Sequence, residues 1–209
     1  MADQKRPVRS KSQAERRRII LNAALSTFAA KGFASARIED IAKAAGVGKG
    51  TVYLYFPDKE SLFKSLIGDN LEPLIAHGAG ILEASPQSPR KALSTFYALI
   101  ETEVLETNRA ALLRLMITEM PNFPDVAAYY HANLIRPGMQ LVQKLLTIAH
   151  DRGELRSAKV LQVPQMVVAP ILISAIWGML FSPFGAFDRR AAFEVSLDNL
   201  FISPERETP

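Results

Sequence analysis

Cysteine is absent from this 209-residue chain, and its histidines are few. Without cysteine there is no disulfide framework, thiolate zinc site or cysteine nucleophile, a composition that fits the reducing cytoplasm. His77, His131 and His150 lie far apart in the sequence, which argues against a metal site. A P-loop and a G-x-S-x-G motif are also missing. We therefore expect a cytoplasmic protein that is not an enzyme and needs no cofactor.

Two further absences concern membranes. The N-terminal segment MADQKRPVRSKSQAERRR has no apolar run, so we expect no secretory signal. Residues 160–187 contain no charged side chain, and about twenty apolar residues can cross a membrane. Glutamines and prolines shorten this run to about Met166–Phe181, however, and no basic cluster flanks it closely. A helix that is apolar on all sides is then a buried helix, and we expect no membrane span.

Positive charge is concentrated at the N-terminal end. Residues 1–60 contain 12 basic and 6 acidic side chains, whereas the rest of the chain contains 13 basic and 15 acidic ones. A basic block on a nearly neutral body indicates a polyanionic partner for that block. A solubilising tail would give the same pattern, so charge alone leaves both interpretations open.

Apolar residues recur with a helical period in the N-terminal block. The S-Q-A-E sequence at residues 12–15 is a capping box, and Ile20, Ala24 and Phe28 repeat every four residues after it. Gly32 follows where a left-handed C-cap is needed. Because no alternating strand pattern occurs anywhere in the chain, the sequence predicts an all-α fold.

Two short helices separated by a tight turn come next. The spacing predicts helices over Ile38–Ala45 and Lys49–Phe56, with a turn at Gly46–Gly48 between them and Pro57 at the end. Helices this short must pack on each other and on the preceding helix to be stable. The inner face predicted for them consists of Ile41, Ala42, Ala45, Val47, Val52 and Phe56.

The outward face of the second short helix combines donors and aromatic rings and includes no acidic side chain. Its residues are Lys49, Gly50, Thr51, Tyr53 and Tyr55. This is the layout of a helix-turn-helix whose second helix enters the major groove of DNA.

The segment GFASARIEDIAKAAGVGKGTVYLYFPDKESLF resembles the DNA-binding domain of the TetR family of bacterial regulators, and the similarity covers about residues 12–68. The turn glycine, the T-V-Y-x-Y-F segment and the following K-E-x-L-F occur together and in the family's order. The resemblance implies an N-terminal three-helix helix-turn-helix domain followed by a C-terminal helical bundle that binds a ligand and dimerises.

The resemblance also implies which residues contact DNA. The positions that match the family's contacts are Lys49, Gly50, Thr51, Tyr53, Tyr55 and Lys59. Lys59 follows a predicted Asp58 N-cap and is expected to grip phosphate at the start of the fourth helix. Where the family usually has Thr or Ser before the first helix of the motif, this chain has Ala36 and Arg37, so Ser35 is expected to cap and Arg37 to contact phosphate.

The predicted domain order is a disordered basic arm over 1–11, a helix-turn-helix domain over 12–57, a connecting helix region over 58–84, and a ligand-binding and dimerisation domain over 85–203. The arm contains Lys5, Arg6, Arg9 and Lys11 and can lie along DNA. Pro73 is expected to break the connecting helix, and Pro137–Gly138 to kink a long helix over Asp125–Arg152. The segments 114–134 and 145–156 resemble the AefR-like C-terminal subgroup of the family.

In the family, a pocket lies inside the C-terminal bundle, and the last two helices, here 165–181 and 188–202, form the dimer. The side chains expected at the pocket, unless they are ordinary core, are Phe96, Tyr97, Met116, Met120, Phe123, Tyr130 and Trp177. Those expected at the dimer interface are Met166, Ile173, Ile176, Leu180, Phe193, Leu197 and Leu200. No buried acid or histidine pair indicates a charged effector, so we expect a small apolar one.

These features predict a ligand-responsive repressor that binds a palindromic operator in double-stranded DNA as a homodimer. Two recognition helices about one helical turn apart bind far more tightly than one. Activation in place of repression stays open, as does a ligand-independent architectural DNA-binding protein, whose affinity would follow salt steeply and show no operator preference.

Overall fold

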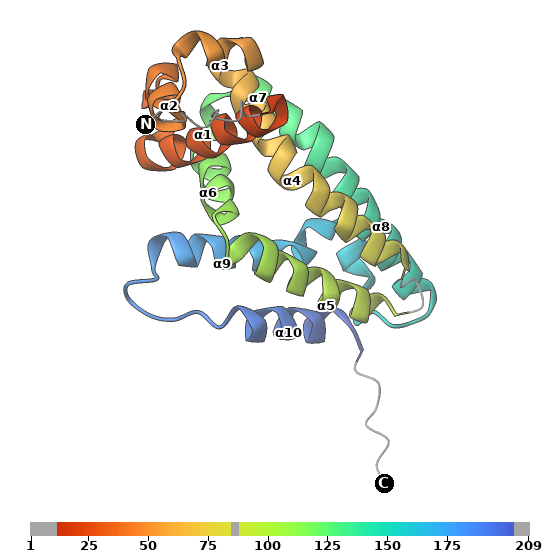
Figure 1. The fold of residues 1–209 in the computed structure, drawn as a ribbon. Coiled ribbons are helices and arrows are strands. Elements are labelled where there is room, and N and C mark those ends of the chain that lie inside the picture. The colour runs from red at the N-terminus through yellow and green to blue at the C-terminus, as the bar shows by residue number, and fades with distance from the viewer. Residues whose placement is uncertain (1–11, 85–87, 203–209) are drawn as a thin grey trace, which may run out of the picture. The chain divides into compact units, whose positions relative to one another are not determined.

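The computed structural model of the protein describes residues 12–84 and 88–202 (Figure 1). Within these ranges the regular elements are helical, and the pairing of extended backbone is limited to an antiparallel bridge between Leu155 and Phe201. The predicted all-α fold is confirmed. The chain divides into two compact units, Met1–Leu66 and Ile67–Pro209. The predicted arm with Lys5, Arg6, Arg9 and Lys11 lies outside the described residues.

The first unit begins with α1 (Gln13–Ser35). The Ser12 hydroxyl accepts a hydrogen bond from the Glu15 backbone N–H at 3.1 Å, as the capping pattern predicts. The predicted inner stripe is fully buried and consists of Ile20, Ala24 and Phe28. At Gly32 the backbone adopts a φ of 75°, so the helix is broken where the left-handed residue was expected.

The helix-turn-helix follows as α2 (Ile38–Ala45) and α3 (Lys49–Tyr55). Gly46 ends α2 with a φ of 66°, and the Val47 N–H donates to the Ala42 carbonyl at 3.0 Å across the turn. Of the predicted inner face, Ile41, Ala42, Val52 and Phe56 are buried, and Ala45 and Val47 are half-buried. The apolar spacing therefore predicted correctly which face of each short helix packs inward.

Three phenylalanines form the centre of the first unit. The Phe28 ring centroid lies 5.2 Å from that of Phe33 and 5.5 Å from that of Phe63, and the Phe33 and Phe63 centroids are 4.8 Å apart. Phe63 comes from the start of α4 (Lys59–Ala84). Aromatic pairs at these separations add about 0.5–1.5 kcal/mol each to the burial energy. They join α1 to α4, while α2 packs on α1 and α3 on α2.

α4 continues into the second unit as one helix that includes Pro73. The predicted break at this residue was wrong. Proline removes one backbone hydrogen bond, but it does not end a helix that packing holds on both sides. Pro73 itself is exposed, whereas Leu71 and Leu74 beside it are 8% and 7% exposed. Burial of the flanking leucines offsets the loss.

The remaining elements of the second unit are α5 (Pro89–Ile100), the π-helical segment η1 (Glu101–Leu105), α6 (Arg109–Glu119), the 3-10 turn η2 (Met120–Asn122), α7 (Pro124–Tyr130), the π-helical segment η3 (His131–Ile135), α8 (Arg136–Asp151), the 3-10 segments η4 (Ala158–Gln162) and η5 (Pro164–Val167), α9 (Ala169–Leu180) and α10 (Arg189–Leu200). In place of the kink expected at Pro137–Gly138, η3 precedes α8, and Pro137 lies in the first turn of α8, where proline is tolerated. In the described part of the chain, no helix combines the length and apolar character that a membrane crossing requires.

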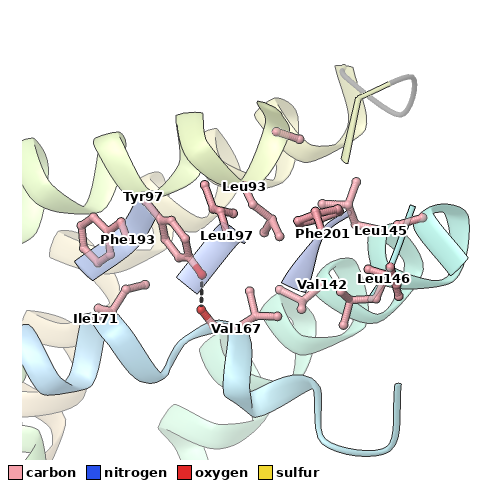
Figure 2. Close-up of a cluster of buried hydrophobic side chains, with 13 residues drawn as sticks. Leu93, Tyr97, Val142, Leu145, Leu146, Val167, Ile171, Phe193, Leu197 and Phe201 are labelled. Atoms are coloured by element: carbon pink, nitrogen blue, oxygen red, sulfur yellow. Dashed lines mark hydrogen bonds between the residues drawn. The ribbon is translucent and has the colours of Figure 1, made fainter. Parts of the chain in front are cut away.

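Tyr97 of α5 lies in the buried core of the second unit (Figure 2). Its ring stacks on Phe193 of α10 with 4.7 Å between centroids, and its hydroxyl donates to the Val167 carbonyl at 2.5 Å. Burial raises the pKa of Tyr97 from 10.0 to about 12, so the hydroxyl stays protonated and able to donate. A single side chain thus joins α5, η5 and α10.

We expect Tyr97→Phe to lower the free energy of unfolding by about 1–2 kcal/mol, because it leaves the buried Val167 carbonyl without this donor. Urea denaturation followed by circular dichroism measures the change. Tyr53→Phe removes an exposed hydroxyl from α3 and serves as the control. Equal stability of wild type and Tyr97→Phe would mean that the hydrogen bond contributes nothing to the core.

Candidate nucleic-acid interface and apolar cavity

α3 carries the predicted contact residues on its surface. Lys49, Gly50 and Tyr53 are exposed, and Thr51 and Tyr55 are half-buried. The inward side of the helix is fixed by Val52, which is completely buried. The sequence analysis did not single out Leu54, which is 84% exposed. Its position was the available signal, because a residue two places from Val52 lies on the opposite side of a helix.

Lys49 forms an ion pair with an acidic side chain of the neighbouring helix α2. Its Nζ lies 2.5 Å from Oε1 of Glu39 on α2 and 5.7 Å from the centre of the Tyr53 ring. The hydrogen bond between them raises the pKa of Lys49 and lowers the pKa of Glu39. The side chains are exposed, so the pair is weak and exchangeable. An anion on this surface has to compete with Glu39 for the Lys49 ammonium.

Arg37 lies immediately before α2, as predicted, and its side chain is exposed. Its backbone N–H donates to Oδ2 of Asp40 at 3.3 Å. The Asp40 carboxylate thus pairs with the amide just before α2, where Ser35 was expected to act as the cap. Ser35 is instead the last residue of α1. The hydrogen bond from Lys31, whose Nζ lies 2.9 Å from Oδ2 of Asp40, lowers the pKa of that carboxyl group. Arg37 stays a predicted phosphate contact.

Lys59 has a different environment from the one the resemblance implies. Its Nζ donates to the carbonyl oxygens of Phe33, Ala34 and Ala36 at 2.8, 3.0 and 3.1 Å, and lies 4.7 Å from the centre of the Phe33 ring. An ammonium has three N–H donors, and these contacts use all of them. Lys59 therefore holds the segment between α1 and α2 against the start of α4, and a phosphate would have to compete with three carbonyls for its donors.

The start of α4 is also occupied by its own carboxylate. The Ser61 backbone N–H donates to Oδ1 of Asp58 at 2.6 Å, which confirms the predicted N-cap. This hydrogen bond lowers the pKa of Asp58. The anionic cap already uses one amide of this helix end, which makes the predicted phosphate contact of Lys59 less favourable.

The second unit contains an apolar cavity of about 370 Å³. Its walls come from α4, α5, α6, α7, α8 and α9, from the 3-10 segment η5, and from both π-helical segments, through Val104 of η1 and Leu134 and Ile135 of η3. π-helical turns occur frequently at functional sites. Gly78 allows α4 and α5 to lie close together, because a Cβ at this position would lie 3.0 Å from Cε2 of Phe96 on α5.

Of the predicted pocket residues, Phe96, Met116 and Tyr130 line the cavity, and Tyr97, Met120, Phe123 and Trp177 do not. Tyr97 is part of the packed core. The Trp177 ring packs on Phe181 and Phe187, and its Nε1–H donates to the Gly185 carbonyl at 3.3 Å. Aromatic character alone did not separate cavity from core. The sequence analysis did not predict the part of the wall that comes from α4, which includes Leu71, Leu74 and Gly78. An apolar helix face is equally typical of an ordinary core.

Part of the predicted dimer surface is exposed to solvent in the described chain. Met166, Ile173 and Leu180 are 57%, 50% and 51% exposed, and Ile176 and Leu200 are half-buried. Phe193 and Leu197 are 4% and 1% exposed, because they pack into the core around Tyr97. These two residues are therefore not accessible to a second subunit. α9, which was expected to be buried on all sides, has an apolar face open in the single chain.

We expect Lys59→Met to lower the stability of the first unit by about 2 kcal/mol, because three carbonyls lose a charged donor while the aliphatic packing on Phe33 is kept. Hydrogen exchange of the backbone amides in α1 and α2 measures the change. Lys43→Met removes an exposed lysine from α2 and is the control. Unchanged protection together with weakened DNA binding would return Lys59 to the phosphate-contact set.

Known proteins resemble this chain in both units. A family model described as "Bacterial regulatory proteins, tetR family" matches residues 20–66, and one described as "Tetracyclin repressor-like, C-terminal domain" matches residues 87–183. The HTH-type transcriptional regulator EthR from Mycolicibacterium smegmatis is 32% identical over 139 residues, which are 66% of this chain and 63% of that protein. RutR from Escherichia coli is 40% identical over 68 residues, 32% of each chain. The matches thus span from 32% to 63% of the length of these curated relatives.

Solved structures share the fold. A transcriptional regulator from Saccharomonospora viridis in complex with choline has a TM-score of 0.74 at 20% identity and covers 91% of this chain and 100% of its own. FadR from Bacillus subtilis in complex with stearoyl-CoA has a TM-score of 0.65 at 21% identity and covers 87% and 95%. The AefR-like subgroup stays a prediction. With the helix-turn-helix geometry and two family models that match residues 20–66 and 87–183, the chain belongs to the TetR family, a family of transcription regulators and not of enzymes.

Proposed function

We propose that this protein is a ligand-responsive repressor that binds a palindromic DNA operator as a homodimer in the cytoplasm. The observation that carries the proposal is the surface of α3, where Lys49, Thr51 and Tyr53 lie on the side opposite the buried Val52. A rigid short helix with donors and an aromatic ring on one side is suited to the major groove. The positive charge of the first 60 residues supplies the attraction to phosphate.

Each α3 contact residue has a defined chemical role in this proposal. Lys49 exchanges Glu39 for guanine O6 and N7, and the Thr51 methyl group contacts a thymine methyl. Gly50 lets the backbone approach the DNA, and Tyr53 and Tyr55 contact bases and phosphate. Leu54, which is 84% exposed, adds an apolar surface for a thymine methyl. Arg37 provides a phosphate contact that sets the register.

The proposal of a dimer rests on the open apolar face of α9. A short recognition helix covers few base pairs, so operator specificity requires a second copy. Ile173 and Leu180 of α9 are each at least half exposed in the single chain, although they are apolar, and so is Met166 of the preceding segment η5. Neighbouring side chains on α9, including Leu172 at 42% and Trp177 at 37%, extend this surface. A continuous apolar face of this kind favours association of two copies.

The cavity is the proposed effector site. FadR from Bacillus subtilis is solved with stearoyl-CoA and the Saccharomonospora viridis regulator with choline, so proteins of this fold hold small molecules. We propose that a small apolar effector shifts the dimer towards a form in which the two recognition helices no longer match the half-site spacing. A ligand can do this only if it binds that form more tightly.

Selection of binding sites from a random duplex library tests the base-reading role of α3. We expect the wild type to enrich a palindrome with half-sites about 10 base pairs apart, and the double variant Lys49→Ala, Tyr53→Ala to lose that enrichment. Lys43→Ala, which removes an exposed lysine from α2, is the control. It should still select the same palindrome, with weaker binding as the largest expected effect. Equal or absent enrichment by both proteins would favour the architectural DNA-binding protein.

Sedimentation analysis tests the dimer. We expect the wild type to sediment as a dimer and Ile173→Glu as a monomer, because a carboxylate buried in an apolar interface costs several kcal/mol, about 3 or more. Thr147→Glu adds the same charge at an exposed position of α8 and should stay dimeric. A dimeric Ile173→Glu variant would assign the interface to another surface.

A further inference from the structure

We infer that the cavity binds an uncharged, largely apolar molecule with one hydrogen-bonding group, and that this group pairs with the hydroxyl of Tyr130. The inference rests on the proposed function, since it specifies the chemical class of the effector. It draws on the charge of the cavity wall, the state of the Tyr130 hydroxyl and the contrast between Tyr130 and Tyr97.

The cavity wall offers no counter-charge to a ligand. Its lining side chains include no lysine, arginine, histidine, aspartate or glutamate. An ionised group moved from water into such a wall loses its hydration and gains no partner, which is strongly unfavourable. A quaternary ammonium would find only the faces of Phe96 and Tyr130 as aromatic surfaces, whereas a carboxylate or phosphate would find no cationic donor. The wall therefore selects against charged molecules of either sign.

Tyr130 supplies the hydrogen-bonding capacity inside this wall. Its hydroxyl takes part in no hydrogen bond with a described residue. Burial raises the pKa of Tyr130 well above 10.0, so the group is neutral and can both donate and accept. Tyr130 is half-buried, so a ligand that fills the cavity has to replace the water that can otherwise pair with this hydroxyl. Gln165, the other polar side chain on the wall, is exposed and has access to water.

The contrast between the buried Tyr97 and the half-buried Tyr130, both in the second unit, shows why Tyr130 points to a ligand. Tyr97 has the same chemistry, but its hydroxyl is paired with the Val167 carbonyl at 2.5 Å and its ring stacks on Phe193. Tyr97 is therefore satisfied by the fold itself. Tyr130, at the end of α7, has no such partner and lines the cavity. The tyrosine whose hydroxyl has no hydrogen bond to a described residue is therefore the one that lines the cavity.

Isothermal titration of the full chain with three probes of equal chain length tests the inference. The probes are 1-decanol, decanoate and decyltrimethylammonium, which are neutral, anionic and cationic. We expect decanol to bind at least about tenfold more tightly than either charged probe, because only the charged head groups must be desolvated without a partner. Equal or tighter binding of a charged probe, or no binding of decanol, would overturn the inference.

The role of the hydroxyl is tested with Tyr130→Phe, which keeps the ring. We expect this variant to bind decanol about three- to tenfold more weakly and to keep the unfolding temperature of the free protein, since no hydrogen bond within the fold is lost. Tyr129→Phe, at a neighbouring position that does not line the cavity, should bind decanol like the wild type. Undiminished decanol binding by Tyr130→Phe would overturn the assignment of the polar contact.

These titrations contain no DNA, and the binding-site selection contains no probe, so the two results are independent. If the protein selects a palindrome but binds the three probes equally, the proposed DNA-binding function is supported and the neutral effector is contradicted. If the protein prefers decanol but selects no palindrome, the proposed ligand class is supported and the proposed operator binding is contradicted.

Discussion

The shortness of α2 and α3 is the constraint on which the DNA-binding surface depends. Helices of eight and seven residues have too few internal hydrogen bonds to be stable by themselves. Their orientation is set by burial of Ile41 and Val52 and by the phenylalanine cluster that joins α1 to α4. The outward residues of α3 are therefore only as well positioned as the core beneath them, and core mutations will act on DNA recognition as well as on stability.

The availability of backbone carbonyls decides which polar side chains are structural. Lys59 and Tyr97 both have chemistry suited to a ligand, yet the fold uses the Lys59 ammonium on three carbonyls and the Tyr97 hydroxyl on one. Lys49 is paired only with the exposed Glu39, and Tyr130 has no hydrogen-bond partner among the described residues. The groups left weakly paired or unpaired are those free to act on another molecule.

This distinction also explains how far the sequence could be interpreted. Local patterns predicted α2, the Gly46 turn, the inner face of α3 and the Asp58 cap, because each depends on residues a few positions apart. Local patterns could not predict the carbonyl partners of Lys59 and Tyr97, because the Phe33 and Val167 carbonyls lie 26 and 70 residues away from them in the sequence. The cavity wall shares its composition with the core, so periodicity could not separate Tyr130 from Tyr97 or predict that Phe193 faces inward.

α4 belongs to both functions proposed for the chain. Its first residue, Lys59, anchors the segment before α2, and Leu71, Leu74 and Gly78 further along it form part of the cavity wall. The helix continues without a break from Lys59 through Pro73, which lies between the cavity residues Leu71 and Leu74. If effector and operator favour different arrangements of the dimer, each weakens the binding of the other by the same factor, because linkage is reciprocal. The effector affinity of the free dimer therefore has to exceed that of the operator complex, by a ratio equal to the loss of operator affinity.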